Sequence, residues 1–207
     1  MASTAAIQSP ADTANLALTR MGYKLRIGSL YDGSFAAKKL LDVYSQTRDA
    51  LLRSFDWQFC ERNVAMTLLK SAPPSGYWPA APWNPVDYPS LPWAFQYAYP
   101  DDCLKVRAIR SGQGFVQNFD PQPVVFSVEN DNSVPPAKRV IVCNVPDAIL
   151  VYTGQTADPT TWDVGFVEAF SADLAKHVAA GLLGKDGYMI EAADAKSAAN
   201  EAQTEQG

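Results

Sequence analysis

Apolar residues near the start of the chain recur every three to four positions, which is the spacing of an amphipathic helix. The stretch "SPADTANLALTRMG" offers Ser9 as an N-cap, Pro10 at the first helical position, Asp12 in a capping-box position and Gly22 as a stop. The sequence therefore predicts a short first helix. Its apolar stripe comprises Thr13, Leu16, Ala17 and Met21.

A second helix is predicted after the turn signal "YDGS", from about Phe35 to Phe55, where the same period continues. Its expected buried face comprises Ala37, Leu40, Leu41, Tyr44, Leu51, Leu52 and Phe55. Charged residues of this segment lie largely off that face, so we expect the two helices to pack together.

From Trp57 onward the period changes to the alternation typical of strands, beginning with "NVAMTLLK". In "PWAFQYAYPDDCLKV" the aromatic residues Trp93, Phe95, Tyr97 and Tyr99 occupy every second position and share one face, which we expect to pack on the helices. Four further β-rich runs follow between turn signals: "CLKVRAI", "PVVFSV", "KRVIVCN" and "AILVYTG". This spacing favours a small antiparallel sheet or sandwich.

Helical periodicity returns near the end of the chain. The run "DPTTWDVGFVEAFSADLAKHVAAGLLG" begins with an Asp-Pro cap signal and predicts a third helix. Its apolar face comprises Phe166, Phe170, Leu174, Val178 and Leu182. A fourth helix is predicted from about Tyr188 to Glu205. Its stripe of small residues consists of Ala192, Ala195, Ala199 and Ala202.

Taken together, these patterns predict an α+β protein that is a mostly α-helical bundle of about four helices, with an inserted small antiparallel β-rich region. We expect residues 1–57 and 158–207 to form the bundle and residues 58–157 to form the β-rich insertion. A Pro/Trp-rich arm at 72–92 belongs to the insertion.

The arm contains seven prolines between residues 73 and 92, and proline removes backbone donors, so an extended loop is expected here instead of a central strand. Its aromatic side chains must find a surface, and two alternatives stay open: they fold back onto their own domain, or they dock on a partner. The candidate partner-interface residues are Tyr77, Trp78, Trp83 and Tyr88.

The charge and cysteine content narrow the classes of function. A net charge of -5 and a pI near 4.8 argue against tight binding to nucleic acid or to an anionic membrane. Cys60, Cys103 and Cys143 are widely spaced and odd in number, so reduced, buried thiols are expected. The first residues lack the features of a signal peptide and no apolar run is long enough to span a bilayer, so we expect an intracellular site of folding.

The sequence predicts no enzyme, no cofactor and no metal site. His177 is the only histidine, and its place in the third predicted helix favours a packed or capped structural role over a catalytic one. A thiol-dependent hydrolase that pairs His177 with one of the cysteines lacks a local signature. The glycine-rich stretches "SGQG" and "GLLGKDG" match no phosphate-binding motif, and Asp101 and Asp102 follow Pro100 as turn residues.

Read in order, several segments resemble one family. The most specific are "Y-x-x-x-R-D-x-L-L" at Tyr44, Arg48, Asp49, Leu51 and Leu52, the following Trp57, and "Y-x-Y-P-x-D-C-L" from Tyr97 to Leu104. With "ANLALTRMG", "IGSL" and "FVEAFSADLAKHVAAGLLG", they make the chain similar to the head-to-tail adaptors of short-tailed bacteriophages, also called tail tubular protein A. The similarity spans about Asn15 to Ala202, although residues 111–147 and the proline arm contribute no matching motif.

The resemblance implies a structural virion protein at the head-to-tail interface, assembled in the host cytoplasm. It implies a ring, dodecameric in the family, that joins the portal protein to the tail nozzle protein; tail fibres are a further candidate partner. Genomic double-stranded DNA would pass through this ring without specific binding, and the negative charge is compatible with that passage. Two alternatives stay open: a monomeric peptide- or glycan-binding module that uses the aromatics from Tyr77 to Trp93, and the thiol-dependent hydrolase.

Overall fold

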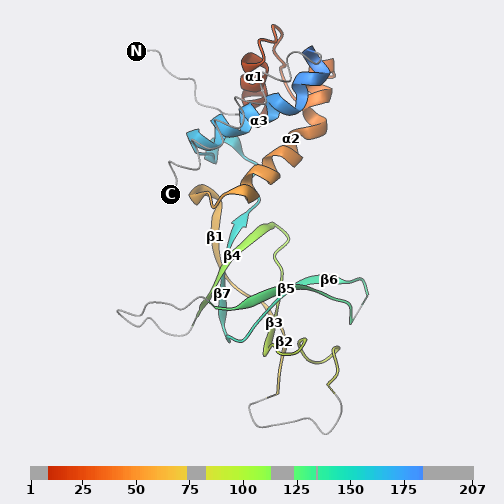
Figure 1. Cartoon of the computed structure of the whole chain (residues 1–207), viewed down its shortest axis with the longest axis vertical. Helices are drawn as coiled ribbons and strands as arrows, with labels where there is room; N and C mark the ends of the chain where they lie inside the picture. The colour runs from red at the N-terminus through yellow and green to blue at the C-terminus, as the bar shows by residue number, and fades with distance from the viewer. Residues whose placement is uncertain (1–8, 74–82, 113–123, 134, 184–207) are drawn as a thin grey trace, which may run out of the picture. The chain divides into compact units, whose positions relative to one another are not determined.

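The chain divides into two compact units in a computed structural model that describes residues 9–73, 83–112, 124–133 and 135–183. One unit comprises Met1–Cys60 and Gln155–Gly207 and contains the helices. The other comprises Glu61–Gly154 and contains the strands (Figure 1). The boundaries predicted from the sequence, after residue 57 and before residue 158, each differ from these by three residues.

Helix α1 (Pro10–Arg20) begins and ends where its capping residues predict. The Ser9 hydroxyl accepts a hydrogen bond from the Asp12 amide, and Pro10 occupies the first helical position. At the other end Gly22 has a φ of 71°, while the Gly22 and Tyr23 amides donate to the carbonyls of Thr19 and Leu18. This pair of bonds is the Schellman arrangement, which glycine permits because it has no Cβ.

The loop after α1 is fixed by Asn15, a buried polar residue that the periodicity does not single out. Its side-chain amide donates to the Ile27 carbonyl at 2.9 Å and accepts from the Ile27 amide at 2.8 Å. Both backbone groups of a buried loop residue are thereby satisfied, which anchors the loop to α1.

Helices α2 (Phe35–Ser54) and α3 (Val164–Leu183) complete the helical core, with two short 3₁₀ turns, η1 (Gln58–Cys60) and η2 (Pro159–Thr161). The buried face of α2 follows the predicted stripe except at Leu41, which is exposed. Phe166 of α3 lies between two tryptophans, with ring centroids 5.2 Å from Trp57 and 5.0 Å from Trp162. These near-perpendicular ring contacts are a favourable arrangement for aromatic pairs.

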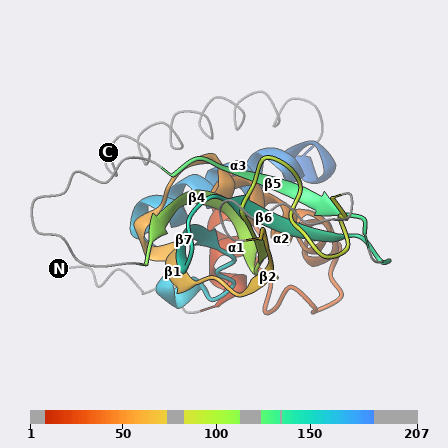
Figure 2. The ribbon, with the colours of Figure 1, turned by 90° about the horizontal axis from the view of Figure 1, so that it is seen from below.

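The second unit consists of two antiparallel sheets, with strand orders β1-β7-β4 and β2-β3-β6-β5. Figure 2 shows β5 alongside β6, as their register requires. The strands are β1 (Glu61–Ala65), β2 (Leu68–Ser71), β3 (Phe95–Ala98), β4 (Cys103–Ser111), β5 (Phe126–Asp131), β6 (Lys138–Cys143) and β7 (Ala148–Gly154).

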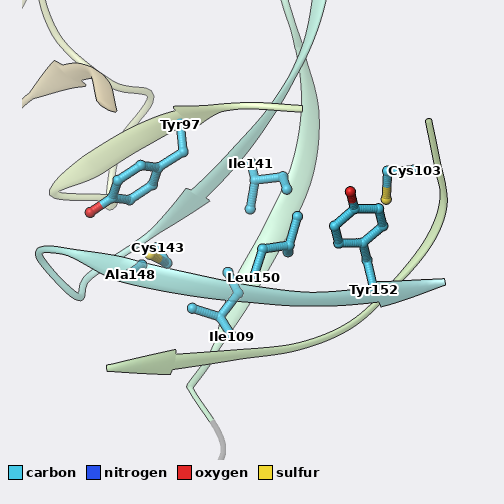
Figure 3. Packing of buried hydrophobic residues seen from close by; sticks show 8 residues of the cluster. All are labelled: Tyr97, Cys103, Ile109, Ile141, Cys143, Ala148, Leu150 and Tyr152. Atoms are coloured by element: carbon cyan, nitrogen blue, oxygen red, sulfur yellow. The ribbon is translucent and has the colours of Figure 1, made fainter. Parts of the chain in front are cut away.

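The strand unit has its own hydrophobic core, to which both sheets contribute side chains (Figure 3). Tyr97 of β3 and Ile141 of β6 come from one sheet, and Ile109 of β4 and Leu150 of β7 come from the other. Tyr97 therefore packs inside the sandwich, with Phe95 and Tyr99 partly buried against the same core. Our expectation that the aromatic face packs on the helices is wrong, because Tyr97 is enclosed by strand residues.

The predicted fold class is also wrong. The described residues form three α-helices and seven strands, so the chain is not a mostly helical four-helix bundle with a small β insertion. The sequence predicts a small antiparallel sheet or sandwich as a minor insertion, whereas the strands pair in two antiparallel sheets with a shared core and make up a whole unit. The predicted fourth helix, residues 188–205, lies outside the described residues.

Trp57 offers a direct test of the helical core, because its side chain is fully buried and its indole N–H donates to the Leu51 carbonyl at 3.1 Å. We expect Trp57→Ala to lower the free energy of unfolding by roughly 3–5 kcal/mol, since it removes a large apolar group and leaves a cavity. Chemical denaturation measures this loss. The control is Phe35→Ala at an exposed ring, which should cost less than about 1 kcal/mol. An unchanged midpoint for Trp57→Ala would contradict the packing around Phe166.

Candidate interaction surface

The described half of the proline arm is organised around a turn at Asn84. The Asn84 side-chain oxygen accepts from the Val86 amide at 2.9 Å, and its carbonyl accepts from the Tyr88 amide at 3.0 Å. This turn brings the rings of Trp83 and Tyr88 to a centroid distance of 4.9 Å, and the Trp83 indole donates to the Pro89 carbonyl at 2.8 Å. An asparagine that bonds its own backbone here replaces the strand ladder that the prolines cannot make.

Lys70 of β2 ties this turn to the sheet. Its ammonium group donates to the Pro85 carbonyl at 2.7 Å, to the Asp131 carboxylate at 2.5 Å and to the Ser133 hydroxyl at 2.9 Å. All three donors of the ammonium group therefore have acceptors. One side chain from an edge strand holds both the arm and the end of β5.

The Asp131 carboxylate is the hub of the same network. It also accepts from the Gln96 side chain at 2.7 Å and from the Ser133 amide at 2.9 Å. Partial burial opposes ionisation, but the hydrogen bonds from Lys70, Ser133 and Gln96 outweigh it and hold the pKa of Asp131 well below its usual range. The carboxylate therefore stays charged wherever the protein is folded at ordinary pH.

Glu129 of β5 makes a second attachment between the arm and the sheet. Its two carboxylate oxygens accept from the Ser90 hydroxyl at 2.6 Å and from the Trp93 indole N–H at 3.2 Å. Bonds to a charged acceptor are stronger than neutral ones. The chain from the turn to β3 is therefore held at two separate points.

Between the turn and the β5–β6 hairpin lies a cavity of about 290 Å³. Tyr88, Pro85 and Val140 line part of it, and the remaining lining is polar and includes Ser90, Gln96, Glu129 and Asp131. An aromatic ring beside carboxylate and amide groups can stack on a sugar ring and accept bonds from its hydroxyls.

The four predicted interface residues do not share one environment. Trp83 and Tyr88 are half-buried against each other, so the described half of the arm folds back onto its own unit. Tyr77 and Trp78 lie outside the described residues.

The exposed apolar side chains are ones that sequence reasoning missed. On the arm they are Val86 and Leu91, with exposed fractions of 48% and 63%. On β2, an edge strand, Leu68 and Leu69 are 50% and 48% exposed. The sequence did contain a signal for this exposure, namely two adjacent leucines in a strand next to a proline-rich segment. Successive side chains of a strand point to opposite faces, so only one of the two leucines can face the core.

The cysteines and the histidine considered for catalysis differ in their exposure to solvent. The three cysteines are buried thiols without a disulfide, as predicted, and burial raises the pKa of Cys103 and Cys143. A nucleophilic cysteine requires the opposite shift. The expected packed role of His177 is wrong, since its side chain is exposed and lies 3.7 Å from Asp173 on the same helix.

The turn expected at Asp101 and Asp102 is present. Asp101 and Asp102 form a turn closed by the Cys103 amide on the Pro100 carbonyl, and Asp102 also accepts from the Tyr152 hydroxyl at 3.0 Å. Among the described residues, no group of three or more potential ligands could hold a metal ion. Over the same ranges, no helix has the length and apolar character needed to cross a membrane.

Comparison with known proteins leaves the family resemblance untested. No protein-family model matches the sequence, and no curated protein matches it.

The charge on Asp131 predicts a pH dependence. Because its pKa is lowered in the folded chain, its contribution is complete above the unfolded value of about 4 and is lost as the pH falls toward the folded value. We expect Asp131→Asn to cost about 2 kcal/mol at pH 7, with the difference from the parent shrinking below about pH 4. Urea denaturation across this range measures the difference. A cost independent of pH would contradict the assignment. The control, Asp101→Asn at an exposed turn, should cost less than about 0.5 kcal/mol at pH 7.

Proposed function

We propose that the protein is a structural, non-enzymatic connector, the head-to-tail adaptor of a short-tailed bacteriophage. It would assemble as a ring between the portal protein and the tail nozzle and form part of the DNA ejection channel. The sequence motifs from Tyr44 to Trp57 and from Tyr97 to Leu104 suggest this role.

The observation that carries the proposal is the exposed edge of the sandwich. Strand β2 ends its sheet, and Leu68 and Leu69 are about half exposed on it. Edge strands with apolar side chains are sites at which another chain can pair. Strand β2 has a register shift between Leu68 and Lys70, but the Lys70 ammonium group is bonded to Pro85, Asp131 and Ser133 and so does not shield the two leucines. Val64 of β1 adds a further exposed apolar side chain, four residues before β2 begins. Such a surface suits a protein that is completed by assembly.

The helical unit supports an assembly role in a different way. Leu25, Tyr31 and Phe35 are exposed apolar residues within a short stretch between α1 and the start of α2. Both units thus present apolar side chains that a neighbouring subunit or a portal protein could cover.

The proposal predicts assembly on a template. We expect the isolated chain to be a monomer or small oligomer in mass photometry, and to form a ring-sized complex when its cognate portal protein is added. Persistent absence of a complex would overturn the connector proposal. The double variant Leu68→Asp/Leu69→Asp should reduce assembly because it places charges on the edge, whereas Leu183→Asp, at the end of α3 and outside both exposed apolar patches, is the control. Normal assembly of the double variant would retain the connector and exclude this edge as its interface.

A second candidate function is a glycan-binding module, which the cavity beside Tyr88 favours. The ring would serve as the stacking platform, while Glu129 and Gln96 would bond hydroxyl groups.

This alternative predicts a stable monomer with a saturable ligand. Glycan-array screening followed by calorimetry should then give binding that Tyr88→Ala abolishes and that Val86→Ala, two residues away, leaves unchanged. No saturable glycan, or equal binding by both variants, would exclude this candidate.

A further inference from the structure

A second cavity, of about 410 Å³, lies within the helical unit at the first turn of α1. One wall comes from α2 through Leu41, Ser45 and Arg48, and another comes from the loop after α1 through Leu30 and Tyr31. None of the residues of the hydrogen-bond network around Lys70 and Asp131 lines this second cavity. Its volume lies within the range of ligand-binding clefts.

Arg48 is the unusual residue of this cavity. Only 7% of it is exposed, although arginine is rarely buried without full pairing. Its Nε–H donates to Asp49 Oδ1 at 2.8 Å, and within the described ranges Asp49 is the only hydrogen-bond partner of the guanidinium. The two terminal amino groups, with four N–H donors, therefore have no protein acceptor there.

Hydrogen bonds involving neighbouring residues fix the orientation of the Arg48 side chain. Asp49 holds the Nε–H, and its other carboxylate oxygen accepts from Gln155 at 2.9 Å. Next to it Tyr44 stays neutral, since burial raises its pKa to about 12, and its hydroxyl is bonded to Thr13 at 2.7 Å. The guanidinium is thus fixed, which lowers the entropy lost when an anion binds.

The first turn of α1 adds to the preference for an anion. Pro10 and Ala11 line the cavity, and the N-terminal end of a helix carries a partial positive charge; Pro10 has no N–H and the Asp12 amide is capped by Ser9, so the first turn contributes mainly through this charge. The Asp49 carboxylate already offsets part of the charge on Arg48, so the site suits a single negative charge better than a dianionic phosphate.

We propose that this cavity binds a carboxylate side chain of a partner polypeptide, with the two terminal amino groups of Arg48 gripping both carboxylate oxygens. Such bidentate pairing is the geometry for which a guanidinium is suited. Leu30, Leu41 and Tyr31 form the apolar part of the wall, so the partner residue next to the acid is apolar. The inference does not depend on ring formation.

The test uses the full chain labelled with ¹⁵N and titrated with the blocked dipeptide Ac-Leu-Glu-NH₂. We expect saturable shifts of the Arg48 Nε–H signal and of the Leu30 and Tyr31 amides. Two probes serve as controls: Ac-Leu-Gln-NH₂, which has the same shape without the charge and should bind at least about tenfold more weakly, and inorganic phosphate, which should also bind more weakly. No saturation by the glutamate peptide, equal binding of both peptides, or tighter binding of phosphate would each overturn the proposal.

Substitutions test whether the peptide binds through Arg48. Arg48→Met should abolish the shifts, and Arg48→Lys, which keeps the charge but loses the planar fork, should weaken binding by about tenfold. Arg53→Met removes an exposed arginine from the same helix and should leave binding unchanged. If Arg48→Met fails to fold, Arg48→Lys decides, and parent-like affinity in that variant would refute the role of Arg48.

Discussion

The ring of Phe166 holds together the two points at which the chain passes between its units. Trp57 lies just before the chain enters the strand unit and Trp162 lies shortly after it returns, and both pack edge-on against this one ring. On the strand side the same two segments are paired, since Glu61 of β1 lies opposite Thr153 of β7. The outgoing and returning chains are therefore fixed next to each other by aromatic packing in one unit and by a strand ladder in the other. Bringing the two ends of a long insertion together costs closure entropy, which grows only slowly with its length, and these aromatic and strand contacts offset that cost.

Local sequence patterns were enough to predict most helices and strands, but they did not predict which strands pair with one another. Ser9, Pro10 and Gly22 mark both ends of α1 because caps act through neighbouring backbone groups. The β-rich runs were found by alternation, but alternation does not say which strands pair. The partners of β7 are β1 and β4, far apart in sequence, and β4 contains two register shifts that its sequence does not announce. One sheet and two sheets therefore looked alike, and the helical content was overweighted.

The candidate sites, too, were only partly predictable from the sequence. Counting prolines and aromatics identified the arm, yet could not tell that Trp83 and Tyr88 would stack on each other while Val86 and Leu91 faced outward. That outcome depends on Lys70, a lysine that reads as an ordinary surface charge in the sequence. Arg48 is a similar case. It was singled out only as part of a family-like motif, because a charged residue on an amphipathic helix is assigned to the exposed face by its polarity.

Lys70 and Arg48 differ in how many of their N–H donors have acceptors, and this difference decides whether each side chain can bind a ligand. Lys70 has three acceptors for its three donors, so it stabilises the arm and has no donor left for a ligand. Arg48 has five donors and one carboxylate partner among the described residues, so its network is open on the side of the cavity. No buried side-chain nitrogen or oxygen of the described residues lacks a hydrogen-bond partner, so the terminal amino groups of Arg48 are open to the solvent of the cavity that they line. An external carboxylate would replace that solvent and complete the pairing, and any ligand that binds only the folded chain would stabilise the helical unit.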